Sequence, residues 1–347
     1  MVLYFGRKPL KIIQLVIISF VVTGLFSCTN QTSSVGAQEG STVDSIVYYT
    51  QNIVSDSSNA QLFASRARLY LANGNLDPAL RDLNRALALQ PENPSLYQTL
   101  SDVYLVLGQT DNSLGALRKA ISLNPDAVPP YLKLAEVYLL LDNPRAAIGA
   151  VDQAISLNGD NAESYYIKGI SLLKSGDTLN AILNLKISVR VDEANFMSYM
   201  QLASIAVSQD DTLSIYYLKQ ALKDQPQDER ALFFLGMTLQ EKRDFEQALD
   251  YFQQVVELYP LNKRAFYHAG YLCLVELSRP NEAVEYFGQA VALDSNYVEA
   301  VYNLGRSYEE ISDEQQARKL YKKALIVLPN YPLAVQGMNR LDEKAGL

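Results

Sequence analysis

The side chains that could perform chemistry are few in this chain, and they lie far apart in its sequence. The 347 residues include one histidine, His268, and two cysteines, Cys28 and Cys273. Neighbouring carboxylates occur at Asp210-Asp211 and Glu309-Glu310, and such pairs can bind a metal ion or act as acid and base. No HExxH, paired CxxC, phosphate-binding glycine loop or GxGxxG accompanies them. We therefore interpret the carboxylate pairs as solvated faces or turns, and predict no catalytic residue, no metal site, no cofactor and no enzymatic activity.

Helices must position these side chains, because most of the chain follows a repeat of about 34 residues. The residue that ends each repeat recurs at steps of 33 to 35 residues. These residues are Pro91, Pro125, Gly159, Glu193, Pro226, Pro260, Ser295 and Pro329. A nearly fixed step of this size is typical of a solenoid, in which each repeat packs mainly on its neighbours.

The residue types within one repeat fit two antiparallel helices. Counting Ala60 as position 1, small residues occupy positions 8, 20 and 27 in nearly all eight repeats, as two helix backbones in close contact require. Position 4 holds larger residues, which we predict to fill the core. They are Phe63, Tyr97, Tyr131, Tyr165, Tyr199, Leu232, Phe266 and Val301.

A polar turn separates the two helices of a repeat. It contains Asn73-Gly74-Asn75 in the first repeat, where glycine and asparagine can adopt the left-handed backbone of a tight turn. Asp77 followed by Pro78 fits an N-cap and a first helical turn, which predicts that the second helix begins there. The fifth repeat is one residue short, the seventh has one extra residue near Ser278-Arg279-Pro280, and the fourth ends in Glu193. We expect an altered turn at these places and no lost repeat.

This register resembles that of the tetratricopeptide repeat family, whose unit has an aromatic residue at positions 4 and 24, Leu at 7, Gly at 8, Tyr at 11, Ala at 20 and 27, and Pro at 32. The resemblance covers roughly residues 60–331, and it is strongest over residues 263–331. The matching residues there are Gly270, Phe287, Ala290, Leu304, Gly305, Tyr308, Ala317, Tyr321, Ala324 and Pro329. The resemblance implies an all-α fold, a right-handed α-solenoid of about eight helix hairpins. Apolar patterns before and after the repeats predict capping helices at residues 44–59 and 332–347.

The N-terminus resembles the signal segment of a bacterial lipoprotein. Three basic residues precede a run of 15 mostly apolar residues, 12–26, which is short for a membrane span and typical of a secretory signal. Residues 25–28 read Leu-Phe-Ser-Cys, which resembles the lipobox in which the cysteine receives lipid. The resemblance implies a signal peptide at 1–27, lipidation of Cys28 and a flexible tether over residues 28–43, which are rich in Ser, Thr, Gln and Gly. The alternative is an ordinary signal peptide or an uncleaved anchor, in which Cys28 is incidental.

The chain is acidic, with a formal net charge of −8. Removal of residues 1–27 takes away three basic residues and no acid, so the net charge becomes −11. This charge argues against a phosphate-backbone partner, and we expect no nucleic acid to bind. Cys273 falls at position 11, where the family pattern places a tyrosine, and we interpret it as a buried free thiol.

The resemblance also implies where a partner would bind. In this family the first helices line a concave groove, chiefly through positions 2, 5, 9, 12 and 13. No repeat here has the Lys at 5 and Asn at 9 of members that bind C-terminal carboxylates, so we expect an extended or helical peptide held by side-chain burial. The predicted partner-binding residues lie at positions 5 and 9 of repeats four to seven. They are Tyr166, Ile170, Met200, Phe233, Met237, Tyr267 and Tyr271.

Two other interpretations of these residues are open. They could only pack neighbouring first helices together, or a second copy of the protein could cover them in a homodimer. From the groove and the signal segment together, we expect a non-catalytic adaptor for protein or peptide partners in a bacterial envelope, held at a membrane by the lipid on Cys28. Thr29, and not an acid, follows the cysteine, which favours an outer membrane and the periplasm. The alternative function is a periplasmic holdase for unfolded or apolar chains.

Overall fold

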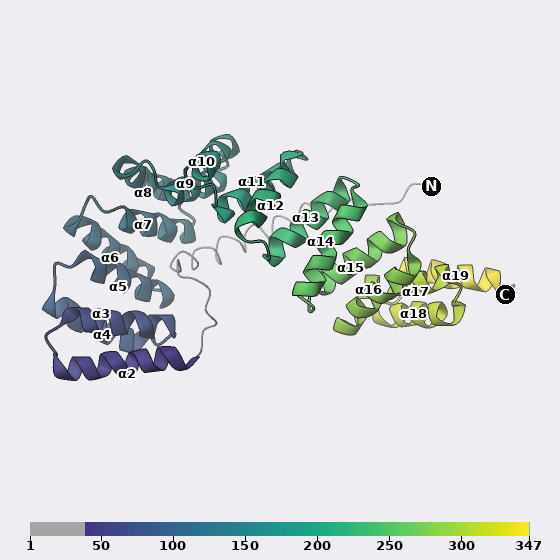
Figure 1. Cartoon of the computed structure of the whole chain (residues 1–347), viewed down its shortest axis with the longest axis horizontal. Helices are drawn as coiled ribbons and strands as arrows, with labels where there is room; N and C mark the ends of the chain where they lie inside the picture. Colours follow the sequence, from purple (N-terminus) through teal and green to yellow (C-terminus); the bar gives the residue numbers. More distant parts are fainter. Residues whose placement is uncertain (1–38, 347) are drawn as a thin grey trace. The chain divides into compact units, whose positions relative to one another are not determined.

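The computed structural model describes residues 39–346, and these residues form helices and turns with no strand. The chain divides after Glu193 into two compact units, which we call the N-terminal unit (up to residue 193) and the C-terminal unit (from residue 194). Each unit contains four two-helix hairpins, one for each sequence repeat, and Figure 1 labels their helices. The all-α fold and the eight hairpins are thus as predicted. The signal peptide predicted at 1–27, the lipidation predicted at Cys28 and most of the predicted tether lie outside the described residues.

The N-terminal unit begins with α2 (Glu39–Ser55), which packs against α3. This helix starts at Glu39, within the segment that the sequence assigned to the tether. The four hairpins follow: α3 (Ala60–Ala72) with α4 (Leu76–Leu89), α5 (Pro94–Val106) with α6 (Thr110–Leu123), α7 (Val128–Leu140) with α8 (Pro144–Leu157), and α9 (Ala162–Lys174) with α10 (Thr178–Val191).

The C-terminal unit contains four more hairpins and a final helix. The hairpins are α11 (Phe196–Ser208) with α12 (Leu213–Asp224), α13 (Glu229–Glu241) with α14 (Phe245–Leu258), α15 (Lys263–Tyr271) and η1 (Leu272–Glu276) with α16 (Pro280–Leu293), and α17 (Val298–Glu310) with α18 (Glu314–Val327). The last helix, α19 (Pro332–Lys344), packs on α18 and α17 at the place where the sequence predicts a capping helix. Within residues 39–346, no helix combines the length and the apolar character that a membrane crossing requires.

The small residues allow close contact between the two helices of each hairpin, as predicted. Ala67 on α3, with Ala79 and Ala86 on α4, are all fully buried. At Gly236 on α13 an added Cβ atom would lie 2.9 Å from the ring of Phe252, closer than real Cβ contacts. Position 8 is therefore small because the side chain at position 24 of the same hairpin packs against its backbone.

Position 4 is only partly buried. Phe63, Tyr199, Leu232 and Val301 are buried as predicted, but the side chains of Tyr97, Tyr131, Tyr165 and Phe266 are half-buried. The hydroxyl groups of Tyr97 and Tyr131 donate to the carbonyls of Pro91 and Pro125, at 2.9 and 3.1 Å. These two tyrosines reach the surface because their hydroxyl groups bond to the preceding turn.

One residue of each inter-helix turn has a left-handed backbone. It is Gly74 (φ 71°) in the first hairpin, whereas Asn73 and Asn75 have φ angles of −90° and −87°, so the prediction was right for glycine and wrong for asparagine. The second helix begins at Leu76, not at the predicted Asp77-Pro78, and Asn75 is its N-cap residue. In the eight hairpins in order, the left-handed residues are Gly74, Gly108, Asp142, Gly176, Asp210, Arg243, Ser278 and Ser312.

The extra residue of repeat seven lies in the first helix, and not in the turn where the sequence predicted a change. Residues 272–276 form the π-helix η1, in which the N–H of Leu277 donates to the carbonyl of Leu272 at 2.9 Å. A π-turn uses one more residue than an α-turn, so it accommodates the insertion and the turn keeps its left-handed residue. In repeat five α12 has 12 residues where α4 has 14, and the turn before it is one residue longer, 209–212 against 73–75, so the turn of this repeat is altered as predicted.

Candidate functional site

Two of the predicted partner-binding residues lie in the N-terminal unit, both on α9. Ile170 is 5% exposed and belongs to the core that also contains Leu132 and Val151. Tyr166 is half-buried and packs against the same core. Ile170 therefore acts as a core residue in this structure, and only Tyr166 of this pair reaches the surface.

The other five predicted residues lie in the C-terminal unit. Met200 on α11 is 3% exposed and is buried in its hairpin. Phe233 and Met237 on α13, and Tyr267 and Tyr271 on α15, are half-buried. All seven predicted residues thus lie on first helices, and neighbouring helices cover two of them, Ile170 and Met200.

The imidazole of His268 joins Phe233 and Tyr267 into one cluster. Its ring is stacked on Phe252 at 5.3 Å between centroids, and meets Phe233 and Tyr267 edge-on at 5.6 Å each. Nδ1 of His268 lies 3.2 Å from Oε1 of Gln240. Burial among these rings, with the nearby charge of Arg264, lowers the pKa of His268 to about 4, so the ring is neutral at pH 7. The sequence singled out His268 only as a lone histidine, and position 6 gave no signal of this packing role.

The sequence prediction missed two tyrosines, of which Tyr297 extends the cluster and Tyr331 forms a separate ring pair in the next repeat. The ring of Tyr297, in the turn before α17, lies 5.1 Å from Tyr267, and Tyr331, in the turn before α19, lies 5.8 Å from Tyr302. In each pair a tyrosine at position 5 meets the tyrosine that directly precedes the next helix. This spacing is visible in the sequence and could have revealed both pairs.

The hydroxyl groups of these tyrosines are protonated at pH 7. Burial, with Glu299 nearby, raises the pKa of Tyr297 and of Tyr331 to about 12, and burial raises the pKa of Tyr267 well above its usual value. The guanidinium of Arg264 lies 4.9 Å from the centroid of Phe233 and adds an exposed cation at the edge. We call Phe233, Tyr267, Tyr271, Tyr297 and Tyr331 the aromatic surface. It combines apolar ring faces with hydroxyl donors.

The first helices of the N-terminal unit carry acidic groups at the equivalent positions. Asp102 and Glu136 occupy position 9 of repeats two and three, and Lys133 donates to Asp102 at 2.5 Å. Burial, with the negative charge of Glu163 nearby, raises the pKa of Glu136 to about 7. Position 9 of repeats two and three is therefore acidic, whereas the same position of repeats six and seven is Met237 and Tyr271.

The remaining candidate groups are structural. Cys273 is a buried free cysteine, as predicted, and burial raises the pKa of its thiol to about 12, which leaves it unreactive at pH 7. Asp210 is the left-handed residue of its turn and its carboxylate pairs with Lys242 at 2.5 Å. In residues 39–346 no group of three or more His, Cys, Asp or Glu side chains is arranged to bind a metal ion.

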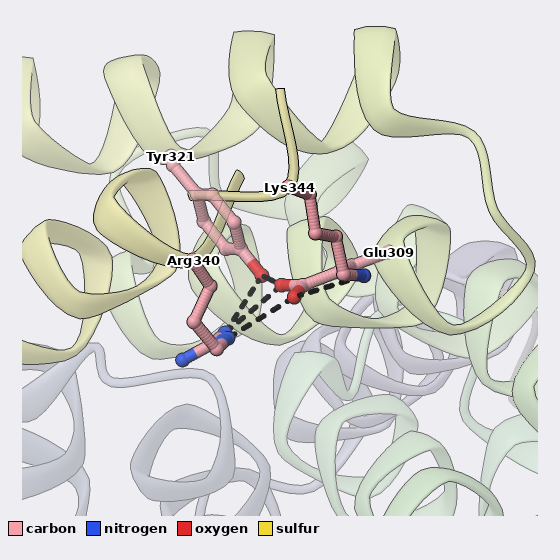
Figure 2. Close-up of polar contacts among 4 residues, drawn as sticks. All are labelled: Glu309, Tyr321, Arg340 and Lys344. Carbon is pink, nitrogen blue, oxygen red and sulfur yellow. Dashed lines mark hydrogen bonds and ion pairs between the residues drawn. The ribbon is translucent and has the colours of Figure 1, made fainter. Parts of the chain in front are cut away.

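Glu309 corrects the prediction of a solvated acidic pair, because its side chain is only 10% exposed. Figure 2 shows its carboxylate between Tyr321 and the two cations Arg340 and Lys344. Arg340 donates to both carboxylate oxygens at 2.9 and 3.0 Å, Tyr321 donates at 2.5 Å, and Lys344 lies at 3.8 Å. These contacts hold α19 on the last hairpin. Glu309 therefore fixes the capping helix and is not exposed to solvent for catalysis.

Comparisons with known proteins agree with this architecture. Family models described as tetratricopeptide repeat match residues 65–128, 132–188, 229–262 and 273–334. Among solved structures, the chain is similar to the C-terminal part of a TPR repeat-containing protein from Cytophaga hutchinsonii, with a TM-score of 0.59 and 17% identity over 69% of this chain and 98% of that one. It also matches YrrB, a TPR protein with an unusual peptide-binding site, with a TM-score of 0.37 and 20% identity over 65% of this chain and 99% of that one.

Two curated relatives match a third of the chain each. Protein O-mannosyl-transferase Tmtc3 of Drosophila melanogaster is 26% identical over 125 residues, which are 36% of this chain and 13% of that protein. Tetratricopeptide repeat-containing protein trd-1 of Caenorhabditis elegans is 28% identical over 117 residues, 33% of this chain and 15% of that protein. The chain thus spans a small part of either relative. Repeats of this kind are typical of non-catalytic scaffolds that bind proteins or peptides, and this chain belongs to the tetratricopeptide repeat family.

Proposed function

We propose that the chain is a non-catalytic scaffold that binds a segment of a partner protein on the aromatic surface of its C-terminal unit. The observation that carries this proposal is the run of ring contacts from Phe233 through His268 and Tyr267 to Tyr297. Because neighbouring rings already hold these side chains in place, a partner that binds there orders few additional side chains. Such preorganisation lowers the entropic cost of binding.

The chemistry of the aromatic surface favours an extended peptide segment. Ring faces bury apolar side chains, and the protonated hydroxyl groups of Tyr267, Tyr297 and Tyr331 can donate to the backbone carbonyls that an extended segment exposes. Arg264 and Glu299 beside these rings can select the charge at the ends of the segment.

We further propose that the scaffold acts in a bacterial envelope, attached to a membrane by lipid on Cys28 and facing the periplasm from the outer membrane. The support is the sequence of residues 1–28: basic residues, an apolar run of secretory length, and the Leu-Phe-Ser-Cys segment. In a lipid-anchored protein, Cys28→Ser releases the processed chain from the membrane fraction. If mass spectrometry finds no acyl group on Cys28 of the membrane-bound wild-type chain, the lipid anchor is excluded.

Photocrosslinking in cells tests the binding surface. A benzophenone side chain placed at Met237 or Tyr271 should capture one or two partner proteins, which mass spectrometry identifies. The matched control is Tyr251 on α14, a second helix of the same unit, which should capture neither partner. Capture of many unrelated unfolded chains at Met237 and Tyr271 would instead support the holdase alternative.

Removal of hydroxyl groups then tests their role as hydrogen-bond donors to the partner. Tyr297→Phe with Tyr331→Phe keeps both rings but removes two donors, and each lost hydrogen bond commonly costs about 1 kcal/mol, or roughly fivefold in affinity. Tyr251→Phe should leave the affinity unchanged. Equal affinities for the double variant and the wild type would show that the partner does not accept hydrogen bonds from these two hydroxyl groups.

A further inference from the structure

The outward positions of the second helices differ sharply in repeats four and five. At position 22 the other six repeats carry polar residues or glycine: Arg81, Gly115, Gly149, Asp250, Glu285 and Lys319. Repeat four has Leu183 there and repeat five has Tyr216. A core requirement does not explain these two residues, since the same position in the other hairpins needs no apolar side chain.

These apolar side chains project into solvent. On α10, Leu179 is 78% exposed and Leu183, one helical turn later, is 57% exposed. On α12, Leu213 is 44% and Tyr216 is 51% exposed. Single exposed leucines are ordinary on protein surfaces, but pairs on consecutive turns of two helices are not.

Basic residues follow the apolar pair on each helix. Positions 25 and 29 are Lys186 and Arg190 on α10, and Lys219 and Lys223 on α12, and all four are exposed. In the described part of the chain none of the four forms an ion pair with a carboxylate. No acid occurs within α10. An apolar residue at 22 with cations at 25 and 29 occurs in these two repeats alone among the eight.

The charge of these two faces is opposite to that of the whole chain. The protein carries a net charge of −8, so an anionic surface repels most of it. The outward faces of α10 and α12 reverse this sign locally and add apolar side chains beside the cations. A partner that complements both features must present anionic groups directly beside an apolar region.

We propose that the outward faces of α10 and α12 bind the surface of a membrane that contains anionic phospholipids. Exposed leucine and tyrosine side chains can enter the boundary between headgroups and acyl chains, where tyrosine is favoured, while lysine and arginine pair with the headgroup phosphates. A docked protein would more naturally accept a recessed apolar surface, whereas Leu179 and Leu183 project from theirs. α10 supplies exposed apolar and basic side chains on the N-terminal unit, and α12 supplies them on the C-terminal unit.

Nitroxide labels on the full chain test this proposal. One label replaces Leu183 and a control label replaces Gly149, the exposed residue at position 22 of repeat three, both in a Cys28→Ser background. The chain is mixed with vesicles of phosphatidylcholine alone or of phosphatidylcholine with phosphatidylglycerol. With the anionic vesicles, oxygen dissolved in lipid should relax the label at 183 more strongly than a water-soluble nickel chelate does. The label at 149 should stay accessible to the chelate in both mixtures.

A second experiment neutralises the basic residues of α10. Lys186→Gln with Arg190→Gln should lower the ratio of docked to free label at 183 roughly thirtyfold, because each cation near an anionic surface contributes about 1 kcal/mol. Lys319→Gln with Lys322→Gln, at positions 22 and 25 of repeat eight, should leave that ratio unchanged. The proposal is overturned if the label at 183 stays water-accessible with anionic vesicles, or if both double variants have the same effect. It is also overturned if only membranes that contain protein protect the label, which would indicate an acidic protein partner.

Discussion

The first three and the last three hairpins of this protein pack with different pairs of residues, and hairpins four and five, which lie between them in the chain, pair Gly169 with Leu185 and Ala203 with Leu218. In hairpins one to three, Ala67, Ser101 and Ala135 at position 8 face aliphatic residues at position 24, whereas in hairpins six to eight glycine faces an aromatic ring. The residues at position 24 are all fully buried. They are Leu83, Leu117, Val151, Leu185, Leu218, Phe252, Phe287 and Tyr321. The two helices of a hairpin can keep their spacing only if the combined volume of the side chains at positions 8 and 24 stays nearly constant. An aromatic ring at position 24 therefore fits only where position 8 is glycine and has no Cβ atom.

The units also differ in their turns and in their buried ionisable groups. The N-terminal unit has glycine at three of its four left-handed turn positions, and the C-terminal unit has none. The N-terminal unit partly buries an acid, Glu136, and the C-terminal unit partly buries a base, His268. The same fold therefore contains two units whose stabilities should respond differently to mutation and to pH.

The largest expected effect is on the glycine–aromatic pair. Gly236→Leu forces a side chain against the buried ring of Phe252, and such overpacking typically costs about 1–3 kcal/mol and sometimes more. Because repeats couple mainly to their neighbours, amide hydrogen exchange should accelerate in α13 to α16 and remain unchanged in α3 to α8. Uniform acceleration from α3 to α18 would contradict the distinction between the units.

Acid should destabilise the C-terminal unit through His268. The folded pKa of about 4 lies below the ordinary value of 6.5, so the unfolded chain binds the proton more readily between these values. The stabilising contribution is present above pH 6.5 and is lost as the pH falls towards 4, on the order of 2–3 kcal/mol. Hydrogen exchange of α13 to α16 from pH 7 to pH 4.5 measures this loss. His268→Phe should remove most of the pH dependence, and an unchanged slope in that variant would exclude His268 as its source.

Glu136 should give the N-terminal unit the opposite pH dependence. Its folded pKa of about 7 lies above the ordinary 4.5, so its contribution is present below pH 4.5 and is lost as the pH rises through 7. Glu136→Gln should therefore stabilise α5 to α10 at pH 8, on the order of 2 kcal/mol, and have little effect at pH 4.5. The exchange rates of these helices at the two pH values provide the measurement. A gain of equal size at both pH values would point to a cause other than ionisation.

The smallest expected effect is in the turns. Arg243 has a φ angle of 65°, which costs a residue with a side chain more than it costs glycine, so Arg243→Gly should stabilise the C-terminal unit by about 0.5–1 kcal/mol. Gly74→Ala, at the same position of the first hairpin, should destabilise the N-terminal unit by a similar amount. Denaturation midpoints of the two variants measure both changes. The comparison of turns fails if both substitutions shift stability in the same direction.

Much of the fold could be predicted from the sequence because repeated packing constrains residue size at fixed spacing. Positions 8, 20 and 27 require small side chains wherever two helices approach, and this signal occurs in nearly all eight repeats. The location of the insertion in repeat seven could not be predicted, because a π-turn in the helix and a longer turn both accommodate one residue. A missed but visible signal is the residue before each first helix, since Asn59, Asn93 and Asn161 cap α3, α5 and α9 with their side chains.

The candidate site could be predicted only in part. The register placed Phe233, Met237, Tyr267 and Tyr271 on first helices where their side chains are half-buried, but it could not distinguish them from Ile170 and Met200. Burial at positions 5 and 9 depends on the size of side chains in the neighbouring repeat, which one repeat's pattern does not contain. The role of His268 was hidden for the same reason, since its partners come from α13, α14 and α15.

The contacts of Glu309 determine how this array could lengthen over evolutionary time. α19 begins at Pro332, where the first helix of a ninth repeat would begin, and Arg340 and Lys344 bind the carboxylate of the eighth. A hairpin duplicated after α18 would separate Glu309 from these cations and leave a largely buried carboxylate without its counter-charges. A hairpin duplicated before α17 would leave the whole arrangement intact. A repeat inserted in the interior of the array therefore leaves these contacts intact, whereas one inserted between the last hairpin and α19 breaks them.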